Sequence, residues 1–353
     1  MIIGLHTDRV GQESYSEKWA EFLTERGVQV KQLNLFAPDA LAQAQKCDGV
    51  MWRWAHLPQE KQSAQKILYT IEHILGIPVY PDSQTAWHYD EKTAQYYLLQ
   101  ALQTPMPQTW LFWARDQALA WAQTAPYPVV FKLSAGAGSS NVIKVESKTR
   151  AIYLIDRMFR RGIFPMTMNE YRQPSGSPRS LTQLVAMMRR MIDAFPYLWR
   201  AEYPKLPPVW WKPEYGYAYF QEFLPGNEFD TRISVIGNRA FAFRRLNRSG
   251  DFRASGSGKL IYDPDQIDMR CVQIALDIST RGQFQSMAYD FLLKNEEPVI
   301  TEISYAFADW AIQLCPGYWN SELDWINKQI WPEEAQVEDF IDRVNNYCQG
   351  NNH

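Results

Sequence analysis

The chain has 353 residues, 46% of them hydrophobic, and this length predicts two or three domains with substantial cores. Its formal net charge of -3 gives no overall electrostatic attraction to nucleic acid, and no segment has the length and hydropathy of a membrane span or a signal peptide. The four cysteines are far apart and form no Cys-x-x-Cys pair, so we expect reduced thiols and a cytoplasmic location.

Residues 1–88 alternate strand and helix patterns, which predicts one N-terminal α/β domain. Strands are expected at residues 2–5, 28–35, 49–54 and 77–80, with helices at 14–26 and 58–75. Such alternation predicts a small, Rossmann-like parallel sheet covered by helices on both faces. A dinucleotide-dependent dehydrogenase is disfavoured, because no glycine fingerprint follows the first strand.

Ligands of parallel sheets collect at the C-terminal ends of the strands. The candidate substrate-binding residues at these ends are His6, Thr7, Asp8, Arg53 and His56. We prefer Arg53 as a carboxylate ligand, because a guanidinium between two tryptophans can stack and still offer a bidentate fork. Packing inside the domain is the alternative for each of the five.

Residues 89–218 are predicted to form a central lobe with two lysines of interest. Lys92 opens a helix-like stretch over residues 90–102. Further on, an apolar strand ends at Lys132, a loop of small residues follows, and a second apolar strand comes next. The loop contains Gly136, Gly138 and Ser139, and glycines let backbone amides approach phosphate oxygens while Lys132 supplies charge. An ordinary hairpin loop is the alternative.

An Arg- and Trp-rich insertion is expected over about residues 164–212. Apolar residues at helical spacing over 181–195 predict a helix that packs on the body of the protein. The remaining cationic and aromatic surface suits a glycan, a phosphate-bearing carrier or a second subunit, and a solvated helical insertion is the alternative. The oligomeric state stays open, with a homodimer as one candidate.

Residues 219–353 are predicted to form a C-terminal lobe with a helical appendix over about 316–353. Two apolar segments flank the turn-prone residues 294–298, which predicts an antiparallel hairpin. Asp290 lies on its first strand, and Glu302 and Ser304 share one face of its second strand. Hard oxygen ligands of this kind suit magnesium, which binds one or two carboxylates together with waters and substrate phosphates.

The motifs of the chain follow one another in a recognisable order. After Lys92 and Lys132 come Gln-Glu-Phe-Leu at residues 221–224, Asp-x-Arg at 230–232, Gly-Asp-Phe-Arg-x-Ser at 250–255, and finally Asp290 with Glu-x-Ser at 302–304. This ordered set, over roughly residues 85–310, resembles the ATP-grasp ligases. The branch of the ribosomal-protein glutamate ligases and glutathione synthetases is the most similar.

The resemblance implies a nucleotide-binding role for each matching residue. Lys92 and Lys132 would neutralise the ATP phosphates, together with the loop of Gly136, Gly138 and Ser139. Backbone groups of Glu222, Phe223 and Leu224 would meet the adenine edge. Asp230 would accept hydrogen bonds from the ribose, with Glu228 as the alternative.

The same resemblance implies the catalytic and metal residues. Arg253 and Ser255 would lie beside the transferring phosphate, where a guanidinium fork suits phosphate geometry. Strand alternation lets only one of Arg244 and Arg245 face the site, and the alignment favours Arg245. Asp290, Glu302 and Ser304 would bind one or two magnesium ions, with manganese as a substitute.

Two residues depart from the pattern of these ligases. Ser255 and Ser304 stand where an asparagine is usual. A hydroxyl is a shorter and weaker magnesium ligand than an amide oxygen, so we expect a loosely held or partly water-ligated second ion. The departures also leave open an altered or lost activity.

The implied fold combines α/β and α+β parts: an ATP-grasp fold with an N-terminal Rossmann-like domain. The implied activity is the ADP-forming ligation of a carboxylate and an amine through an acylphosphate. The carboxylate would come from a small molecule or a glycan, and no nucleic acid would take part. The alternatives are a phosphotransferase on the same fold and an ATP-binding regulatory protein without turnover.

Overall fold

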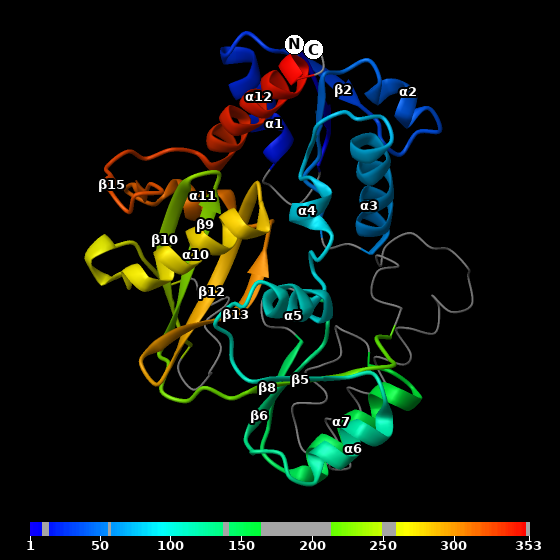
Figure 1. Ribbon diagram of the computed structural model, residues 1–353, viewed down its shortest axis with the longest axis vertical. Helices are drawn as coiled ribbons and strands as arrows, with labels where there is room; N and C mark the ends of the chain where they lie inside the picture. The colour runs from blue at the N-terminus through cyan, green and yellow to red at the C-terminus, as the bar shows by residue number, and fades with distance from the viewer. Residues whose placement is uncertain (9–13, 56–57, 137–140, 164–212, 249–258, 351–353) are drawn as a thin grey trace, which may run out of the picture. The chain divides into compact units, whose positions relative to one another are not determined.

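Figure 1 shows a computed structural model of the chain, which describes residues 1–8, 14–55, 58–136, 141–163, 213–248 and 259–350. The chain divides into two compact units, which are described separately. Unit 1 comprises Met1–Thr109 and Leu224–His353, and unit 2 comprises Trp110–Gly136 and Ser140–Phe223. None of the described helices is both long and apolar enough to cross a membrane.

Unit 1 begins with a parallel sheet of four strands in the order β2-β1-β3-β4. Its strands are β1 (Ile2–His6), β2 (Gln29–Leu33), β3 (Gly49–Met51) and β4 (Val79–Tyr80). The helices that alternate with them are α1 (Tyr15–Glu25), α2 (Ala40–Ala44), α3 (Pro58–His73) and α4 (Ser83–Ala86). The predicted alternation and the predicted parallel sheet are both confirmed.

Helix α12 (Pro332–Gly350) returns from the C-terminus to this N-terminal sheet. Its residues Val337, Phe340 and Val344 are buried in one core cluster with residues of β1 and α1, and Figure 1 shows α12 beside α1. At Gly49 a Cβ atom would lie 2.8 Å from Val344 and 2.9 Å from Phe340, so only glycine permits this close approach. Helices α2 and α3 cover the opposite face.

The larger sheet of unit 1 has the strand order β13-β12-β9-β10-β14-β15, and β11 pairs with β10. Its strands are β9 (Phe229–Ile236), β10 (Arg239–Leu246), β11 (Leu260–Ile261), β12 (Ser286–Lys294), β13 (Glu297–Ser304), β14 (Tyr318–Trp319) and β15 (Trp325–Ile326). The predicted hairpin is β12–β13, and its turn residues Asn295 and Glu296 both have positive φ, as tight antiparallel turns require.

Helices border both faces of the larger sheet. Helix α10 (Met269–Gly282) buries Val272, Ala275 and Ile278 against one face (Figure 1). On the other face, α11 (Asp309–Gln313) covers an apolar region that includes Phe241 and Ala288. Helix α5 (Lys92–Ala101) lies against β13, where the side-chain amide of Gln95 donates to the Ile303 carbonyl at 2.9 Å.

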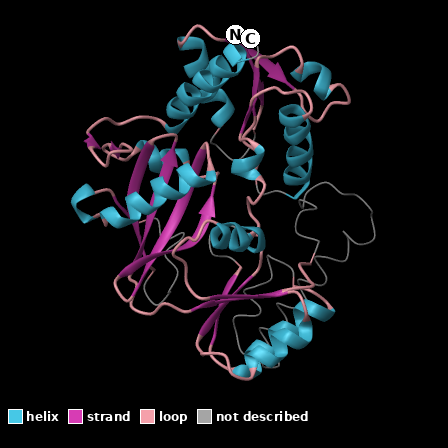
Figure 2. Ribbon diagram, viewed as in Figure 1, coloured by secondary structure: helices cyan, strands magenta, loops and turns pink. Residues whose placement is uncertain are grey.

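Unit 2 is built on a four-stranded sheet with the order β5-β8-β6-β7 (Figure 2). The strands are β5 (Thr109–Phe112), β6 (Val129–Lys132), β7 (Val142–Val145) and β8 (Ala218–Glu222), accompanied by α6 (Arg115–Ala122) and α7 (Lys148–Arg160). Strands β6 and β7 form the predicted antiparallel pair around the small-residue loop. The insertion predicted over 164–212 lies outside the described residues.

A buried acidic group marks the start of α12. Glu333 is 0% exposed, and Lys18 Nζ lies 3.6 Å from its carboxylate. Burial, and then the neighbouring charge of Asp309, raise the pKa of Glu333 to about 8, against 4.5 for an ordinary glutamate. The folded state therefore holds this proton more tightly than the unfolded state does. The free energy of unfolding should fall as the pH rises from 4.5 to about 8.

The variant Glu333→Gln removes this titration. We expect the wild type to lose roughly 2 to 4 kcal/mol more unfolding free energy than the variant between about pH 5 and pH 8, since one pKa unit corresponds to about 1.4 kcal/mol. Urea unfolding across this pH range measures the difference. Glu334→Gln, a neighbour on the same helix that pairs with Arg26, is the matched control. Parallel pH profiles for wild type and Glu333→Gln would contradict the assignment.

Candidate functional site

Several residues predicted for ATP and metal binding lie on one face of the larger sheet in unit 1. Asp290 on β12 is paired in register with Glu302 on β13 and, on its other side, with Arg232 on β9. Arg245 on β10 is paired with Asp230 on β9. Directly paired residues project to the same side of a sheet, as do residues two apart on one strand. The register therefore gathers these five side chains on one face, and Ser304 shares it.

Four of these side chains form an alternating chain of ion pairs. Arg232 donates to both oxygens of Asp290, with Nε–Oδ1 at 2.7 Å and Nη2–Oδ2 at 2.8 Å. Arg245 Nη2 lies 2.7 Å from Asp290 Oδ2, and its Nε donates to Asp230 Oδ1 at 2.7 Å. Both aspartates and Arg245 are 7 to 8% exposed and so are almost entirely removed from water, whereas the Arg232 side chain is 21% exposed.

The two aspartates respond differently to burial. Burial alone would raise the pKa of Asp290, but Arg232 and Arg245 outweigh it, and the pKa lies well below its usual range. The pKa of Asp230 is raised, chiefly by burial and despite Arg245. Asp290 is thus held ionised by two guanidinium groups. The arrangement places a fixed negative charge and two cations beside each other on one sheet face.

Lys92 reaches the same face from the start of α5. It is 5% exposed, and its Nζ lies 3.0 Å from Glu302 Oε1. Helix α5 is fixed against β13 by the Gln95–Ile303 hydrogen bond and by the amide of Ile300, which donates to the Pro105 carbonyl at 2.8 Å. Two residues that the sequence motifs assigned to phosphate and to metal are therefore in direct contact.

Three side chains on this face offer oxygen ligands for a magnesium ion. Asp290 and Glu302 supply carboxylates on adjacent strands, and the Ser304 hydroxyl donates to the Ala306 carbonyl at 2.6 Å, which leaves its lone pairs as acceptors. Among the described residues, no three His, Cys, Asp or Glu side chains are grouped to hold a metal ion. Magnesium commonly takes one or two protein carboxylates together with waters and phosphate oxygens, so Asp290 and Glu302 could hold such an ion.

Strand alternation separates the two adjacent arginines of β10. Arg245 faces Asp290, whereas Arg244 is directed to the other side, with its guanidinium 4.2 Å from the Phe229 ring centroid. The oxygens of Asp230 bind Arg245, while the alternative ribose ligand Glu228 is exposed. Arg253 and Ser255 lie outside the described residues.

In unit 2, the predicted phosphate lysine is buried at the end of β6. Lys132 is 8% exposed, and its Nζ donates to Gln221 Oε1 on β8 at 2.7 Å. The loop that follows requires glycine at Gly136, where φ is 118° and a Cβ would lie 2.0 Å from the Asn141 amide nitrogen. Gly138 and Ser139 lie outside the described part of the chain.

The beginning of this loop binds a carboxylate of the protein itself. Glu214 accepts hydrogen bonds from the backbone amides of Ser134 at 2.8 Å and Ala135 at 3.1 Å, and from the hydroxyl of Tyr217. Successive amides that converge on one carboxylate form an anion-binding site. The sequence motifs did not identify Glu214, because it lies far along the chain from the loop and belongs to no recognisable pattern.

The predicted adenine contacts occupy the end of β8 and the residues after it. Glu222 is the last residue of this strand and is half-buried. The ring centroid of Phe223 lies 4.5 Å from Lys144 Nζ. Leu224 follows directly and belongs to unit 1. The placement is compatible with backbone groups of a hinge-like segment, and the adenine contact itself remains a prediction.

The predicted substrate-binding residues at the end of β1 form hydrogen bonds within the protein. His6 lies 3.2 Å from the Leu33 carbonyl, and burial lowers its pKa. Thr7 accepts a hydrogen bond from Gln32, and the carboxylate of Asp8 accepts from the amide of Ser16 at 2.9 Å, at the start of α1. His56 lies outside the described residues.

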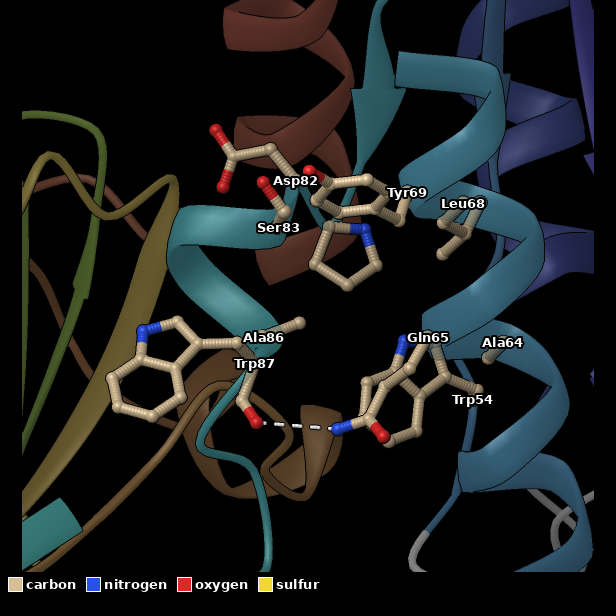
Figure 3. A pocket seen from close by; sticks show the side chains of 10 residues that line it. Trp54, Ala64, Gln65, Leu68, Tyr69, Asp82, Ser83, Ala86 and Trp87 are labelled. Carbon is tan, nitrogen blue, oxygen red and sulfur yellow. Dashed lines mark hydrogen bonds between the residues drawn. The ribbon is translucent and has the colours of Figure 1, made fainter. Parts of the chain in front are cut away.

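A pocket of about 280 Å³ lies beside α3 and α4 (Figure 3). Its walls are mainly apolar and aromatic, and Gln65 at its edge donates to the Trp87 carbonyl at 3.2 Å. The lining residues are Trp54, Ala64, Gln65, Leu68, Tyr69, Pro81, Asp82, Ser83, Ala86 and Trp87. None of the residues predicted for ATP or metal binding lines it.

Comparison of the sequence with protein-family models and with curated proteins finds no match. Solved structures, in contrast, match along nearly the whole chain. A RimK-domain ATP-grasp protein from Sphaerobacter thermophilus has 15% identity and a TM-score of 0.51, covering 97% of this chain and 99% of that one. D-alanine–D-alanine ligase from Bacillus anthracis has 12% identity and a TM-score of 0.53, with both chains covered completely.

A third similar structure is the ATP-grasp ligase PsnB, solved with a minimal precursor, Mg and ADP. It has 12% identity and a TM-score of 0.53, covering 98% of each chain. These likenesses extend over both sheets of unit 1 and the sheet of unit 2. The chain therefore has the ATP-grasp fold, with an N-terminal parallel-sheet domain.

The ion-pair network predicts strong coupling between Arg245 and Asp230. Arg245→Met should lower the unfolding free energy by about 3 to 5 kcal/mol, because removing one partner of a buried pair leaves a charge uncompensated. Combining it with Asp230→Asn should cost clearly less than the sum of the two single changes. Denaturant unfolding of the four proteins measures the coupling, with the surface pair variant Arg281→Met as control. Additive losses would show that the network is not coupled.

Proposed function

We propose that the protein is an ATP-dependent carboxylate–amine ligase that releases ADP and phosphate. The observation that carries the proposal is the convergence of Asp290, Glu302, Lys92 and Arg245 on one sheet face of an ATP-grasp fold. Carboxylates for a divalent ion beside buried cations for phosphate are what phosphoryl transfer requires. Structural neighbours solved with ATP, or with Mg and ADP, support the same substrate.

In the proposed reaction, a substrate carboxylate oxygen attacks the γ-phosphorus of ATP, and ADP leaves. The amine then attacks the acyl carbon of the resulting acylphosphate, phosphate leaves, and the amine loses a proton to solvent as the amide forms. Magnesium bound at Asp290 and Glu302 would lower the negative charge of the phosphates. The chain contributes cations held in fixed positions, which stabilise charge without reorganisation.

The ion pairs define what must change when nucleotide binds. Asp290 is bound by two arginines, and Glu302 is bound by Lys92. When Asp290 and Glu302 bind a metal ion, Arg245 and Lys92 lose part of their counter-charge and become available to phosphate oxygens. We propose this exchange of partners as the binding mechanism, because every buried charge keeps an opposite charge throughout.

The alternative is an ATP-binding protein without turnover. It is favoured by the complete pairing of both Asp290 oxygens and by the serine at position 304. A phosphotransferase on the same fold is separated from a ligase by hydroxylamine, which captures an acylphosphate as a hydroxamate. A ligase gives the hydroxamate, whereas a kinase acting on a hydroxyl group and a non-catalytic protein do not.

The decisive measurement is ADP release by the full chain with ATP, magnesium and pooled carboxylates and amines, including amino acids and uronic acids. Glu302→Ala should reduce the stimulated rate at least about a hundredfold, the scale for removing one group that stabilises the transition state. Glu297→Ala, an exposed residue on the same strand, is the matched control. Stimulated turnover that survives Glu302→Ala would refute the metal assignment.

Two variants in unit 2 should shift ATP affinity in opposite directions. Lys132→Ala should weaken binding by about 1.5 to 3 kcal/mol, the range for a charge-assisted hydrogen bond. Glu214→Gln should strengthen it several-fold, because a negative charge no longer competes with phosphate for the amides of Ser134 and Ala135. Titration calorimetry with Mg·ATP measures both effects.

The controls for this pair are Lys148→Ala and Glu146→Gln, both exposed residues of unit 2. Unchanged affinity in Lys132→Ala would rule out the phosphate role of this lysine. Weaker binding in Glu214→Gln would mean that the carboxylate supports the loop instead of competing with the nucleotide.

A further inference from the structure

Arg53, two residues after β3, is a cation with no matched anion among the residues that the structure describes. Its Nε is buried and has no hydrogen-bond partner, and across the described ranges the side chain has neither a hydrogen bond nor an ion pair. The side chain as a whole is partly exposed, so its charge loses part of its hydration, and no described side chain supplies a matched counter-charge. Such an unbalanced charge is expected where a ligand supplies the missing anion.

One aromatic ring contacts the guanidinium, and a cluster of further rings includes its chain neighbour Trp54. The central carbon of the guanidinium lies 4.4 Å from the ring centroid of Tyr15, a cation–π distance. The rings of Tyr89 and Tyr305 contact each other with centroids 4.6 Å apart, and both contact Trp54. Burial by itself lowers the pKa of Arg53, but Tyr15, Tyr89 and Tyr305 raise it, and the net direction is upward, so the side chain stays charged.

The nearest carboxylates do not neutralise Arg53. Asp8 accepts hydrogen bonds from the amides of Tyr15 and Ser16, so its oxygens are committed to the first turn of α1. Burial raises the pKa of Glu60, and Arg53 lowers this pKa less than any other neighbour affects it. Both acids are thus near enough to act through space but make no contact with the guanidinium.

The position of Arg53 connects it with the proposed metal residues. It lies at the C-terminal end of a parallel strand, where sheets of this kind bind ligands. The Tyr305 hydroxyl donates to the Trp54 carbonyl at 2.6 Å, and the Tyr15 hydroxyl donates to the Phe307 carbonyl at 2.7 Å. Residues 305–307 directly follow Ser304. The segment that leaves β13 is therefore bound to Trp54, the residue after Arg53, and to Tyr15, whose ring contacts the guanidinium.

We propose that Arg53 binds a carboxylate group of the ligase substrate, an inference that rests on the proposed function. A guanidinium presents two parallel donors that match the two oxygens of a carboxylate. The Tyr15 ring packs on the guanidinium, and these surroundings of low polarity strengthen an ion pair with a carboxylate. Arg53 is thereby a residue that determines which acids the protein accepts.

Thermal unfolding without ATP tests the subsite directly. The probes are acetate, succinate, L-glutamate, D-glucuronate and inorganic phosphate, each at the same ionic strength. At about ten times Kd, a bound carboxylate should raise the Tm of the wild type by about 1 to 3 °C. Arg53→Met should abolish the shift, Arg53→Lys should reduce it, and Arg281→Met should retain it.

The stability of the ligand-free variant gives a second readout. Arg53→Met should unfold at the same temperature as the wild type or higher, because it replaces an uncompensated buried charge by an apolar side chain. A structural arginine would instead lower the Tm when it is removed. Should Arg53→Met fail to fold, the purely structural role would be supported and the proposal overturned.

Three other results would overturn the proposal: an equal carboxylate shift in Arg53→Met, no shift with any carboxylate in the wild type, or a shift with phosphate alone. The test is independent of turnover. Arg53-dependent carboxylate binding without ADP release would contradict the ligase and leave the subsite intact. ADP release together with carboxylate binding that is the same in wild type and Arg53→Met would support the ligase and contradict the subsite.

Discussion

The alternating pairs Asp230–Arg245–Asp290–Arg232 are the interaction on which the candidate site depends. Four ionised groups on a buried sheet face are tolerable only because each lies against an opposite charge. This requirement fixes the rotamers of the two arginines and keeps Asp290 ionised. Lys92 and Glu302 extend the same pattern to α5 and β13. The face is therefore organised before any ligand arrives, which reduces the entropy that binding must overcome.

Preorganisation of this kind also limits which ligands can bind to this face. A ligand that reaches this face must replace each contact that it breaks, since a buried charge without a partner is strongly unfavourable. Under the proposed function, a metal ion without phosphate would separate Asp290 from its arginines, which takes the carboxylate partner from Arg232 and leaves Arg245 paired with Asp230. Metal together with nucleotide brings both signs of charge at once. The electrostatics thus favour joint binding of the two and disfavour either alone.

The sequence predicted the elements of this face better than their connections. Alternation along the strands and the turn at Asn295–Glu296 were sufficient to predict the β12–β13 hairpin and to place Glu302 and Ser304 together. The sequence did not predict the contact between Lys92 and Glu302, because nothing local relates α5 to β13; motif order only assigned one residue to phosphate and the other to metal. Glu214 was missed, since a carboxylate that binds loop amides leaves no periodic signal. The packing of α12 was missed for the same reason: helical periodicity reveals an apolar face but not its partner.

The return of α12 to the first sheet has a consequence for biogenesis. Ile3 and Leu5 leave the ribosome long before Phe340 and Val344, with which they pack. One side of the N-terminal sheet therefore stays only partly covered until α12 has been synthesised. Until then, the exposed apolar surface of the sheet can bind chaperones or associate with other copies of the chain. The sheet of β1 to β4 is thus completed only by α12, a helix that is synthesised much later.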